Sequence, residues 1–313
     1  MKRLLNTLYI TSGNRYLSLD GENVVVMEDK KEIGRIPLHN LQAIVTFGYT
    51  GASPALMGAC AQRNIELSFM SGNGRFLARV SGEEKGNVTL RKTQYRISEK
   101  KEESVKIAKN FILGKVYNAR WVLERAARDY SMRLDAELLK KKSAFLGQSM
   151  NKIRECEDAG TLLGLEGEAA SVYFSAFDER ILQQKEDFYF HGRNKRPPLD
   201  NVNAMLSFGY SLLAGMCGGA LEAVGLDPYV GFFHTDRPGR MSLALDLMEE
   251  FRSVMVDRFV LTLINKRIMK PEYFLTKENG AVIMTEEGRK AFLSAWQGKK
   301  QEMIALKIDG PPM

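Results

Sequence analysis

The feature that most constrains the fold is a change in hydrophobic periodicity near residue 88 of this 313-residue chain. Before it, short apolar runs alternate with turn-forming residues, a pattern typical of β-strands. Strands are expected at 7–10, 16–19, 23–27, 34–36, 43–47, 66–69 and 75–80. A short helix is expected at 53–63, Asn73-Gly74 favours a tight hairpin, and residues 83–86 are typical of a linker.

After about residue 89, apolar residues recur every three or four positions, which predicts helices. Helices are expected at 104–129, 131–142, 145–158, 161–184, 201–223 and 242–267, followed by a small appended unit at 271–308. We therefore predict an α+β protein in which a small N-terminal β-rich domain, residues 1–88, is followed by a larger, mostly α-helical domain, residues 89–313.

The composition is that of an ordinary soluble protein, with 44% hydrophobic and 27% charged residues. Cys60, Cys156 and Cys217 lie far apart and are odd in number, so a disulfide framework is not expected and a reducing, cytoplasmic compartment fits best.

The stretches 41–62 and 201–221 are uncharged and long enough to cross a membrane. Their polar and helix-breaking residues indicate buried soluble elements instead, so no membrane association is expected.

Glu166 has the most unusual surroundings of the acidic residues. On a helix its neighbours three and four positions away are apolar or aromatic: Leu162, Leu163, Ala169, Ala170 and Tyr173. Glu168 instead lines up with Ser171, Val172 and Ser175. A carboxylate in an apolar stripe is costly unless it is paired, hydrogen-bonded or bound to a metal. Glu166 is therefore expected to have a partner.

His234 is the histidine best placed to meet carboxylates. It closes an apolar run at 229–233 and enters a turn before a helix on which Asp246 and Glu249 share a face. Imidazole with carboxylates suits Mn²⁺ or Mg²⁺, and Glu166 could complete such a set. Alternatively, Asp246 and Glu249 pair with arginine, either Arg240 or Arg252, and spacing alone leaves both readings open. Of the other histidines, His39 lies in an ordinary connection, and His191 opens a polar loop that could contact a substrate.

Basic residues indicate a polyanionic partner, in agreement with a net charge of +7. The candidates for binding phosphates are Lys140, Lys141 and Lys142, then Arg193, Lys195 and Arg196, and finally Arg240. Arginine can donate two parallel hydrogen bonds to a phosphate, and such binding falls steeply with salt. A solvated helix end for the lysines and an ion pair for Arg240 are the alternatives. Neither a nucleotide-binding Gly-Lys-Ser/Thr loop nor a dinucleotide fingerprint is found in the sequence.

Three ordered blocks of the sequence resemble the CRISPR-associated adaptation endonuclease/integrase family, with a look similar to members of type I-C systems. The blocks are 165–170 with Tyr173, 196–210, and 231–234 with Arg240 and 242–252. The resemblance covers essentially the whole chain. It implies an N-terminal β domain through which the protein forms homodimers, and a helical catalytic domain. It also implies that two dimers assemble with a dimer of a small partner subunit.

The resemblance further implies metal-dependent DNA strand transfer, in which a 3′-hydroxyl of a short double-stranded fragment attacks the CRISPR repeat. With water as the nucleophile, the same centre hydrolyses DNA. The family's metal-binding glutamate, histidine and final acid fall on Glu166, His234 and Glu249. Asp246 matches a nearby acidic position that assists or holds a second ion, and the implied cofactor is Mg²⁺ or Mn²⁺.

Two other functions are compatible with the same residues. The first is a repair nuclease that acts on branched DNA or RNA through the same metal site. The second is a non-catalytic DNA-binding scaffold, in which the acidic residues form structural ion pairs.

Overall fold

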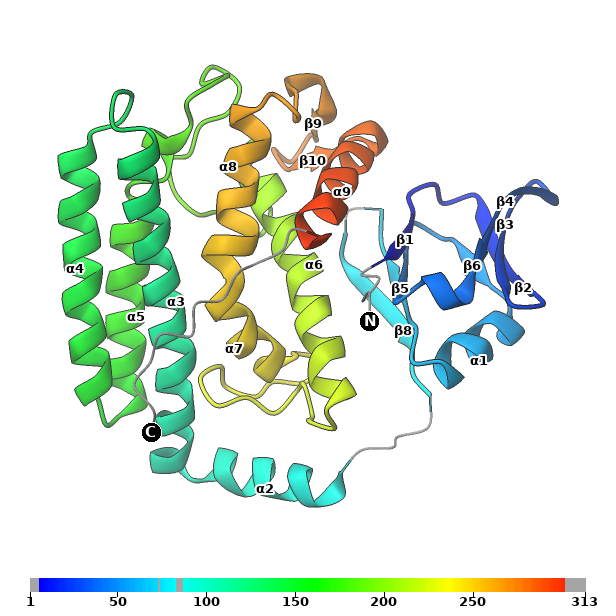
Figure 1. Ribbon diagram of the computed structural model, residues 1–313, viewed down its shortest axis with the longest axis horizontal. Helices are drawn as coiled ribbons and strands as arrows, with labels where there is room; N and C mark the ends of the chain where they lie inside the picture. Colours follow the sequence, from blue (N-terminus) through cyan, green and yellow to red (C-terminus); the bar gives the residue numbers. More distant parts are fainter. Residues whose placement is uncertain (1–5, 73, 83–86, 302–313) are drawn as a thin grey trace.

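The computed structural model describes residues 6–72, 74–82 and 87–301, and it places a β-rich N-terminal region beside a larger helical region (Figure 1). The linker expected at 83–86, Asn73 of the expected hairpin, and the end of the C-terminal unit lie outside these described residues. The predicted order of a β-rich part followed by a helical part is confirmed.

The first N-terminal sheet has four strands in the order β1-β5-β7-β8. Strands β1 (Thr7–Ile10), β5 (Ala43–Phe47) and β7 (Glu66–Met70) run parallel, and β8 (Phe76–Val80) is antiparallel to β7. The central strand β5 is buried from Ile44 to Phe47. Such a continuous apolar run is typical of a strand that is covered on both faces.

The second sheet has the order β4-β3-β2-β6. Strands β4 (Lys31–Pro37), β3 (Asn23–Glu28) and β2 (Arg15–Asp20) are antiparallel neighbours, and the short β6 (Gly51–Ala52) is parallel to β2. The sequence pattern did not predict β6, because a two-residue strand is too short to show alternation. Helix α1 (Pro54–Gln62) contacts both sheets and buries Leu56 and Cys60 in their shared core.

The helical region is organised around α3 (Lys101–Asp129), which follows α2 (Val88–Glu99). Helix α3 packs against α4 (Ala136–Glu155), α5 (Ala159–Phe174) and α7 (Ser242–Phe251). Its buried face is the apolar stripe expected from the sequence, with Ile112, Val116 and Leu123 almost fully enclosed. These contacts bring residues of α3, α5 and α7 within reach of one another.

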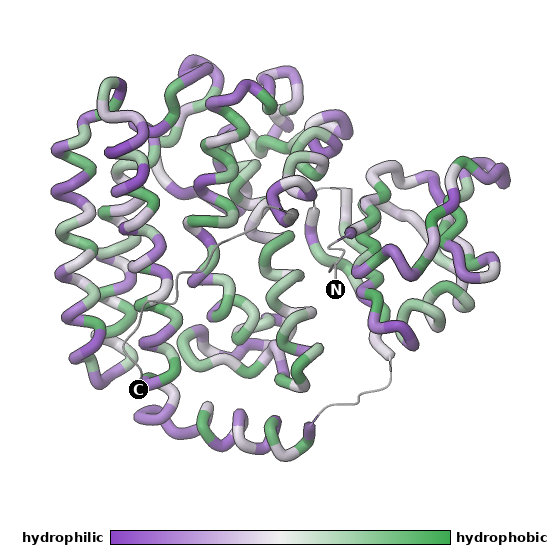
Figure 2. The backbone as a smooth tube through the Cα atoms, in the orientation of Figure 1, coloured by the Kyte–Doolittle hydropathy of each residue, from purple (hydrophilic) through white to green (hydrophobic). Residues whose placement is uncertain are grey.

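Helix α6 (Asn201–Ala223) forms the second centre of the helical region and packs against α7 and α8 (Arg258–Asn265). It is long and apolar enough to cross a membrane, but 61% of its most apolar window is buried inside the protein. Figure 2 shows hydrophobic stretches along α6 in the interior, whereas the outer helix α4 alternates between hydrophobic and hydrophilic positions. The expectation of a central core helix at 201–223 is confirmed.

Three of the expected helices have other bounds in the structure. The helices expected at 131–142 and 145–158 are one helix, α4, which begins after Asp135, whose side chain accepts a hydrogen bond from Leu138 N at 2.9 Å. The buried Ser143 does not break α4, because its hydroxyl bonds to Glu124 on α3. The helix expected at 161–184 ends at Phe174, since the chain beyond is held by tertiary contacts such as that of Phe190 N with Asp178 Oδ1 at 2.7 Å.

The run expected as one helix at 242–267 is interrupted by a π-helical segment, Arg252–Asp257, between α7 and α8. A π-turn widens the helix by one residue and is frequent at functional sites. The C-terminal unit contains a two-stranded hairpin of β9 (Phe274–Thr276) and β10 (Val282–Met284), followed by α9 (Glu286–Gln301). The pattern of the sequence gave no sign of the π-helical segment.

The β-rich and helical regions are joined by polar and aromatic contacts. Arg79 on β8 forms an ion pair with Glu222 on α6, and Ser12 Oγ donates to Glu286 Oε1 on α9 at 2.7 Å. Phe47 on β5 packs against Phe208 on α6 with ring centroids 5.7 Å apart. Between the two regions lies a groove that reaches from β7 and β8 to α6 and β10.

Candidate metal centre

Glu166 lies on the inner side of α5, as its apolar stripe predicted. Its side chain is 16% exposed, whereas Glu168 two residues later is exposed to solvent. The neighbours Ala169 and Tyr173 are buried, but Leu163 is 59% exposed, so its predicted place in the stripe is wrong. Leu162, one residue earlier in the same turn, is fully buried, so Leu163 lies at the solvent-facing border of the stripe. The preference for Glu166 over Glu168 as the buried acid is confirmed.

Lys115 on α3 is the partner that the sequence reading missed. Its Nζ forms an ion pair with Glu166 Oε1, and it lies 2.6 Å from Oε2 of Glu249 on α7. Two carboxylates from different helices therefore face one positive charge. Its position in the sequence could have indicated this role. Lys115 is three residues after the buried Ile112 and four before the buried Ala119, at the edge of an apolar helix face.

Glu249 is almost fully buried between two cations. Its Oε1 accepts a hydrogen bond from Arg252 Nη1 at 2.7 Å, while Oε2 makes the ion pair with Lys115. Burial raises the pKa of this carboxyl, but the charges of Arg252 and Lys115 outweigh burial and bring the pKa to about 2. Glu249 is thus ionised at neutral pH, as a ligand for a cation must be.

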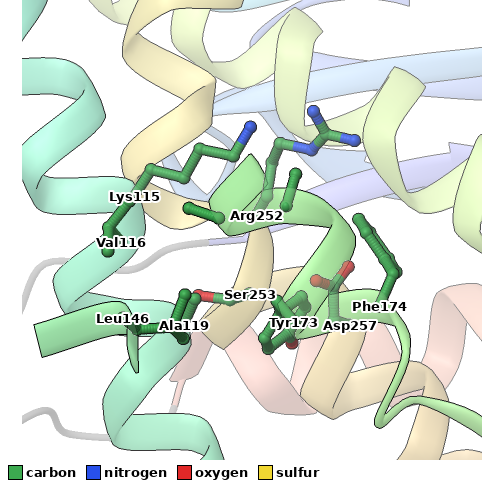
Figure 3. Close-up of a pocket in the computed structure, with 11 residues that line it drawn as sticks. Lys115, Val116, Ala119, Leu146, Tyr173, Phe174, Arg252, Ser253 and Asp257 are labelled. Atoms are coloured by element: carbon green, nitrogen blue, oxygen red, sulfur yellow. The ribbon is translucent and has the colours of Figure 1, made fainter. Parts of the chain in front are cut away.

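Arg252 is anchored from several sides at the start of the π-helical segment. Its guanidinium lies over the ring of Tyr210, 4.3 Å from the centroid. Burial lowers the pKa of Arg252, but the charge of Glu249 together with Tyr210 and Asp257 raises it overall. Figure 3 shows the side chains of Lys115 and Arg252 extending to the same side of the pocket, with Tyr173 and Asp257 below them.

Asp246 organises the turn that carries His234. One carboxylate oxygen, Oδ2, accepts hydrogen bonds from Phe232 N at 2.7 Å and Phe233 N at 2.9 Å. The other, Oδ1, accepts from His234 N at 2.8 Å and lies 2.7 Å from His234 Nδ1. Because the carboxylate accepts at that position, the proton of a neutral imidazole lies on Nδ1, and Nε2 then has its lone pair for another ligand. Asp246 therefore orients the imidazole through Oδ1, while Oδ2 fixes the backbone of the turn that carries it.

Gly231 allows the turn to approach α7 this closely. A Cβ atom at this position would lie 2.8 Å from Ser242 Cβ, 2.9 Å from His234 O and 3.0 Å from Asp246 Oδ2. No larger residue fits without displacing backbone or the buried carboxylate. Steric crowding thus explains why the block Gly231-Phe232-Phe233-His234 begins with glycine.

The structure brings the expected ligands together in two pairs, Glu166 with Glu249 around Lys115, and His234 with Asp246. Within the described residues, no three His, Cys, Asp or Glu side chains are grouped as they would be around a metal ion. Two observations nevertheless fit a divalent cation: Glu166 and Glu249 already converge on a cation, and His234 offers an oriented Nε2. The pairing of Glu249 with Arg252 also agrees with the alternative of a structural ion pair.

The basic residues expected to bind DNA are distributed over three places. On α4, Lys140 and Lys141 are exposed and Lys142 is half-buried. Arg240 is half-buried before α7 and forms no ion pair with a described residue, so the expected pairing with Asp246 or Glu249 is not found. Lys140 forms an ion pair with Glu137 at 4.0 Å on the same helix, whereas Lys141, Lys142 and Arg240 form no ion pair with a described residue.

Arg193 and Arg196 belong to the same loop but have different surroundings. Arg193 is held internally: Nη1 donates to Asn203 Oδ1 at 2.6 Å, and Nη2 donates to Ser207 Oγ at 3.0 Å. Burial lowers the pKa of Arg193. Arg196 is exposed, with Lys195, and both line the groove between the two regions. The Arg193 contacts tie the loop to α6, and its expected role in binding DNA stays a prediction.

The groove has a volume of about 770 Å³ and a strongly basic lining. Among its described lining residues, none is acidic and five are basic: Arg75, Lys195, Arg196, Lys277 and Arg289. Burial lowers the pKa of Lys195, and the nearby charges of Arg252, Arg193 and Arg196 lower it further. Arg193, two residues before Lys195, and Arg252 both lie over the ring of Tyr210, at 5.3 and 4.3 Å from its centroid, so this loop runs close to the Glu249–Arg252 pair. The other two histidines are exposed; His191 stacks on Tyr189, with ring centroids 4.9 Å apart.

Comparisons with known proteins agree with the fold and with the sequence blocks. A family model described as CRISPR associated protein Cas1 matches residues 8–298. CRISPR-associated endonuclease Cas1 1 of Chlorobaculum tepidum is 45% identical over 313 residues, which is 100% of this chain and 91% of the relative.

Solved structures extend the agreement to three dimensions. A casposase bound to integration product is similar with a TM-score of 0.82 and 25% identity, over 97% of this chain and 85% of that chain. A chain of a Cas6-RT-Cas1–Cas2 complex has the same fold, with a TM-score of 0.80 and 23% identity, over 99% of this chain and 33% of that chain. The resemblance first seen in three sequence blocks is thereby confirmed, and the chain belongs to the Cas1 family of CRISPR-associated endonucleases.

Proposed function

We propose that Glu166, Glu249 and His234 hold the divalent ion, Mg²⁺ or Mn²⁺, with which this Cas1 protein inserts short foreign DNA fragments into a CRISPR array. The observation that carries the proposal is the convergence of Glu166 from α5 and Glu249 from α7 on one positive charge. Carboxylate oxygens and imidazole nitrogen are ligands that both ions accept. When bound, such an ion supplies positive charge that stabilises a phosphodiester under attack by a 3′-hydroxyl or by water.

The residues around this set have positioning roles in the proposal. Asp246 holds His234 with Nε2 free to bind, and its own oxygens are used by backbone N–H groups and by Nδ1. Arg252 keeps Glu249 ionised and fixed in direction. We therefore assign Asp246 to the orientation of a ligand, in place of the direct or second-ion role that the resemblance allowed.

Double-stranded DNA is the proposed substrate, both as the incoming fragment and as the CRISPR repeat. The groove is lined by Lys195, Arg196 and three further basic residues and by no acidic one among its described lining residues, and Arg240 lies just before α7. Lys140, Lys141 and Lys142 provide a second basic surface on α4. Contacts of these residues with phosphates would position DNA without reading its sequence.

The proposed assembly is a homodimer formed through the β-rich region and joined by a small partner subunit in the cytoplasm. Membership of the Cas1 family supports this proposal. One protein of similar fold was solved as a Cas6-RT-Cas1–Cas2 complex, which supports a Cas2-type subunit as the partner.

The test is a strand-transfer assay on purified protein with the partner subunit, run with Mn²⁺, Mg²⁺ and chelator. Glu166→Gln is expected to abolish metal-dependent strand transfer while it leaves the fold and the dimer intact. Glu168→Gln is the matched control, because it removes the same charge from the exposed side of the same helix. Unchanged strand transfer by Glu166→Gln would overturn the proposal.

The same experiment separates the two alternative functions. The Lys115 and Arg252 ion pairs favour a scaffold in which the acids are structural, and such a scaffold would bind DNA equally with Mn²⁺ and with chelator. A nuclease acting in repair would cleave branched DNA or RNA but would not join a fragment to a repeat. Comparing joining with simple cleavage on matched substrates therefore decides between the three.

A further inference from the structure

Both oxygens of Glu249 already have a cationic neighbour. Arg252 Nη1 lies 2.7 Å from Oε1, and Lys115 Nζ lies 2.6 Å from Oε2. Lys115 Nζ also contacts Glu166 Oε1, so it lies between the two carboxylates that are the proposed metal ligands. A divalent ion bound to these oxygens at about 2.1 Å would lie too close to an ammonium in this position. One of the two cations must therefore move when a metal ion binds.

Arg252 is the cation that is fixed. It is half-enclosed by the ring of Tyr210, 4.3 Å from the centroid, and it starts the π-helical segment beneath α7. The buried Asp257 lies at the end of the same segment and accepts a hydrogen bond from Tyr210, so the aromatic ring is itself held in place. Moving Arg252 would take one of two cationic neighbours from the buried Glu249 and would also take a nearby positive charge from the buried Asp257, which is costly.

Lys115 is the cation that can move. Its ammonium is carried on a flexible four-carbon stem, and its contacts here are with the two glutamates. A cavity of about 20 Å³, room for a particle the size of a water molecule, lies beside it (Figure 3). Ser253 lines this cavity, and its buried Oγ has no hydrogen-bond partner among the described residues. Lys115 and this unpartnered hydroxyl thus line the same cavity.

We propose that Lys115 is an internal counter-ion that a divalent metal displaces from Glu166 and Glu249. The inference rests on the proposed function, because it presumes that these two glutamates are metal ligands. Without a metal ion, Lys115 and Arg252 balance the two negative charges and hold the carboxylates close together. If a divalent ion bound while Lys115 stayed in place, this largely buried site would carry two excess positive charges. Release of Lys115 prevents that excess. Metal affinity is therefore set by competition with a residue of the protein.

If Lys115 competes with the metal ion, a variant without its charge should bind metal more tightly, although it has lost two ion pairs. Lys115→Met keeps the length of the stem and removes the charge, so Mn²⁺ is expected to bind at least about tenfold more tightly than to the wild type. In chelator the same variant is expected to unfold at a lower temperature, because Glu166 and Glu249 then repel each other. Mn²⁺ should raise its unfolding temperature by more than it raises that of the wild type. Damage to the structure alone would weaken metal binding, so tighter binding reports the competition.

The experiment titrates Mn²⁺ into the full-length protein, with free Mn²⁺ followed by electron paramagnetic resonance, and records thermal unfolding with Mn²⁺ and with chelator. Lys106→Met is the matched control, because Lys106 is an exposed lysine of the same helix α3. It should leave Mn²⁺ affinity within about twofold of the wild type, since an exposed charge is screened. Lys115→Gln supplies a second neutral variant that keeps a polar side chain, in case Lys115→Met does not fold.

The outcomes separate this inference from the proposed metal site. Tighter Mn²⁺ binding by either neutral Lys115 variant supports the inference. Unchanged or weaker binding by both, while Glu166→Gln and Glu249→Gln lose Mn²⁺, overturns the inference and leaves the metal site standing. If Glu166→Gln and Glu249→Gln bind Mn²⁺ as the wild type does, the metal site itself is refuted.

Discussion

Replacement of Asp246 by asparagine tests whether this residue orients His234 or binds metal itself. The carboxylate is fully buried and accepts from three backbone N–H groups and from the His234 ring, at distances of 2.7–2.9 Å. The side-chain oxygen of an asparagine can accept the hydrogen bonds of one carboxylate oxygen. Its NH₂ group, which replaces the other oxygen, cannot accept any. Two donors then lose their acceptor, at about 1–3 kcal/mol for each buried group left unpaired.

From these contacts we expect Asp246→Asn to lower the free energy of unfolding by about 3 kcal/mol, which corresponds to a decrease in Tm of about 6–9 °C. Mn²⁺ affinity should fall by about 10–100-fold, as for other residues that orient a metal ligand, because His234 loses its fixed direction. Urea unfolding in chelator gives the first quantity, and a Mn²⁺ titration gives the second.

Asp236→Asn is the matched control for Asp246→Asn. Asp236 lies in the same turn and accepts from Gly231 N at 3.0 Å, but it is exposed to solvent, so its replacement should cost less than about 1 kcal/mol. If Asp246→Asn lost all Mn²⁺ binding with a stability close to that of Asp236→Asn, the reasoning would be wrong. Asp246 would then be a metal ligand whose hydrogen bonds contribute little to the fold.

Three further variants test other parts of the site. Gly231→Ala should destabilise the protein by about 1–3 kcal/mol, because the added Cβ would contact Ser242 too closely. Gly164→Ala on α5 is the control: its Cβ meets nothing within 4 Å, so it should be neutral or stabilising. Thermal unfolding of both variants tests this difference. Glu249 has a pKa lowered to about 2 from 4.5 by its two cationic neighbours, so its ionised form contributes stability that is complete above pH 4.5 and is lost as the pH falls toward 2. Urea unfolding in chelator should show a shallower loss in that window for Glu249→Gln, and equal slopes would contradict the pairing. Arg196→Ala should reduce the slope of log DNA affinity against log salt by about 1, and an unchanged slope would place this residue away from the phosphates.

The helical periodicity of α5 was sufficient to distinguish Glu166 from Glu168. The side on which a residue lies depends only on its spacing from apolar neighbours within one helix, so a local pattern determines it. The same reasoning failed for Leu163, which is 59% exposed although Leu162 beside it is fully buried, because periodicity does not show how wide a part of the helix surface its tertiary partners cover. It also failed for the boundary within α4, where the tertiary bond from Ser143 to Glu124 is compatible with a continuous helix.

The basic loop after His191 shows a different limit of local pattern. Arg193 and Arg196 are equivalent in the sequence, since both are arginines in a polar segment before α6. In the structure Arg193 is held by Asn203 and Ser207 on α6, and Arg196 lines an open groove. Which arginine is available to a phosphate depends on the path of the loop over α6, and that path is set by hydrogen bonds across ten or more residues.

Local patterns along the chain were enough to predict the α+β architecture, the inward-facing acid on α5 and the family to which the chain belongs, because each of these is expressed in the spacing of residues. Only the tertiary structure identified Lys115 as the partner of Glu166 and showed Asp246 in contact with His234 instead of open to a ligand. Ion pairs between helices act over a few ångströms between residues more than fifty positions apart, and no local period records them. The packing of α3, α5 and α7 sets those distances.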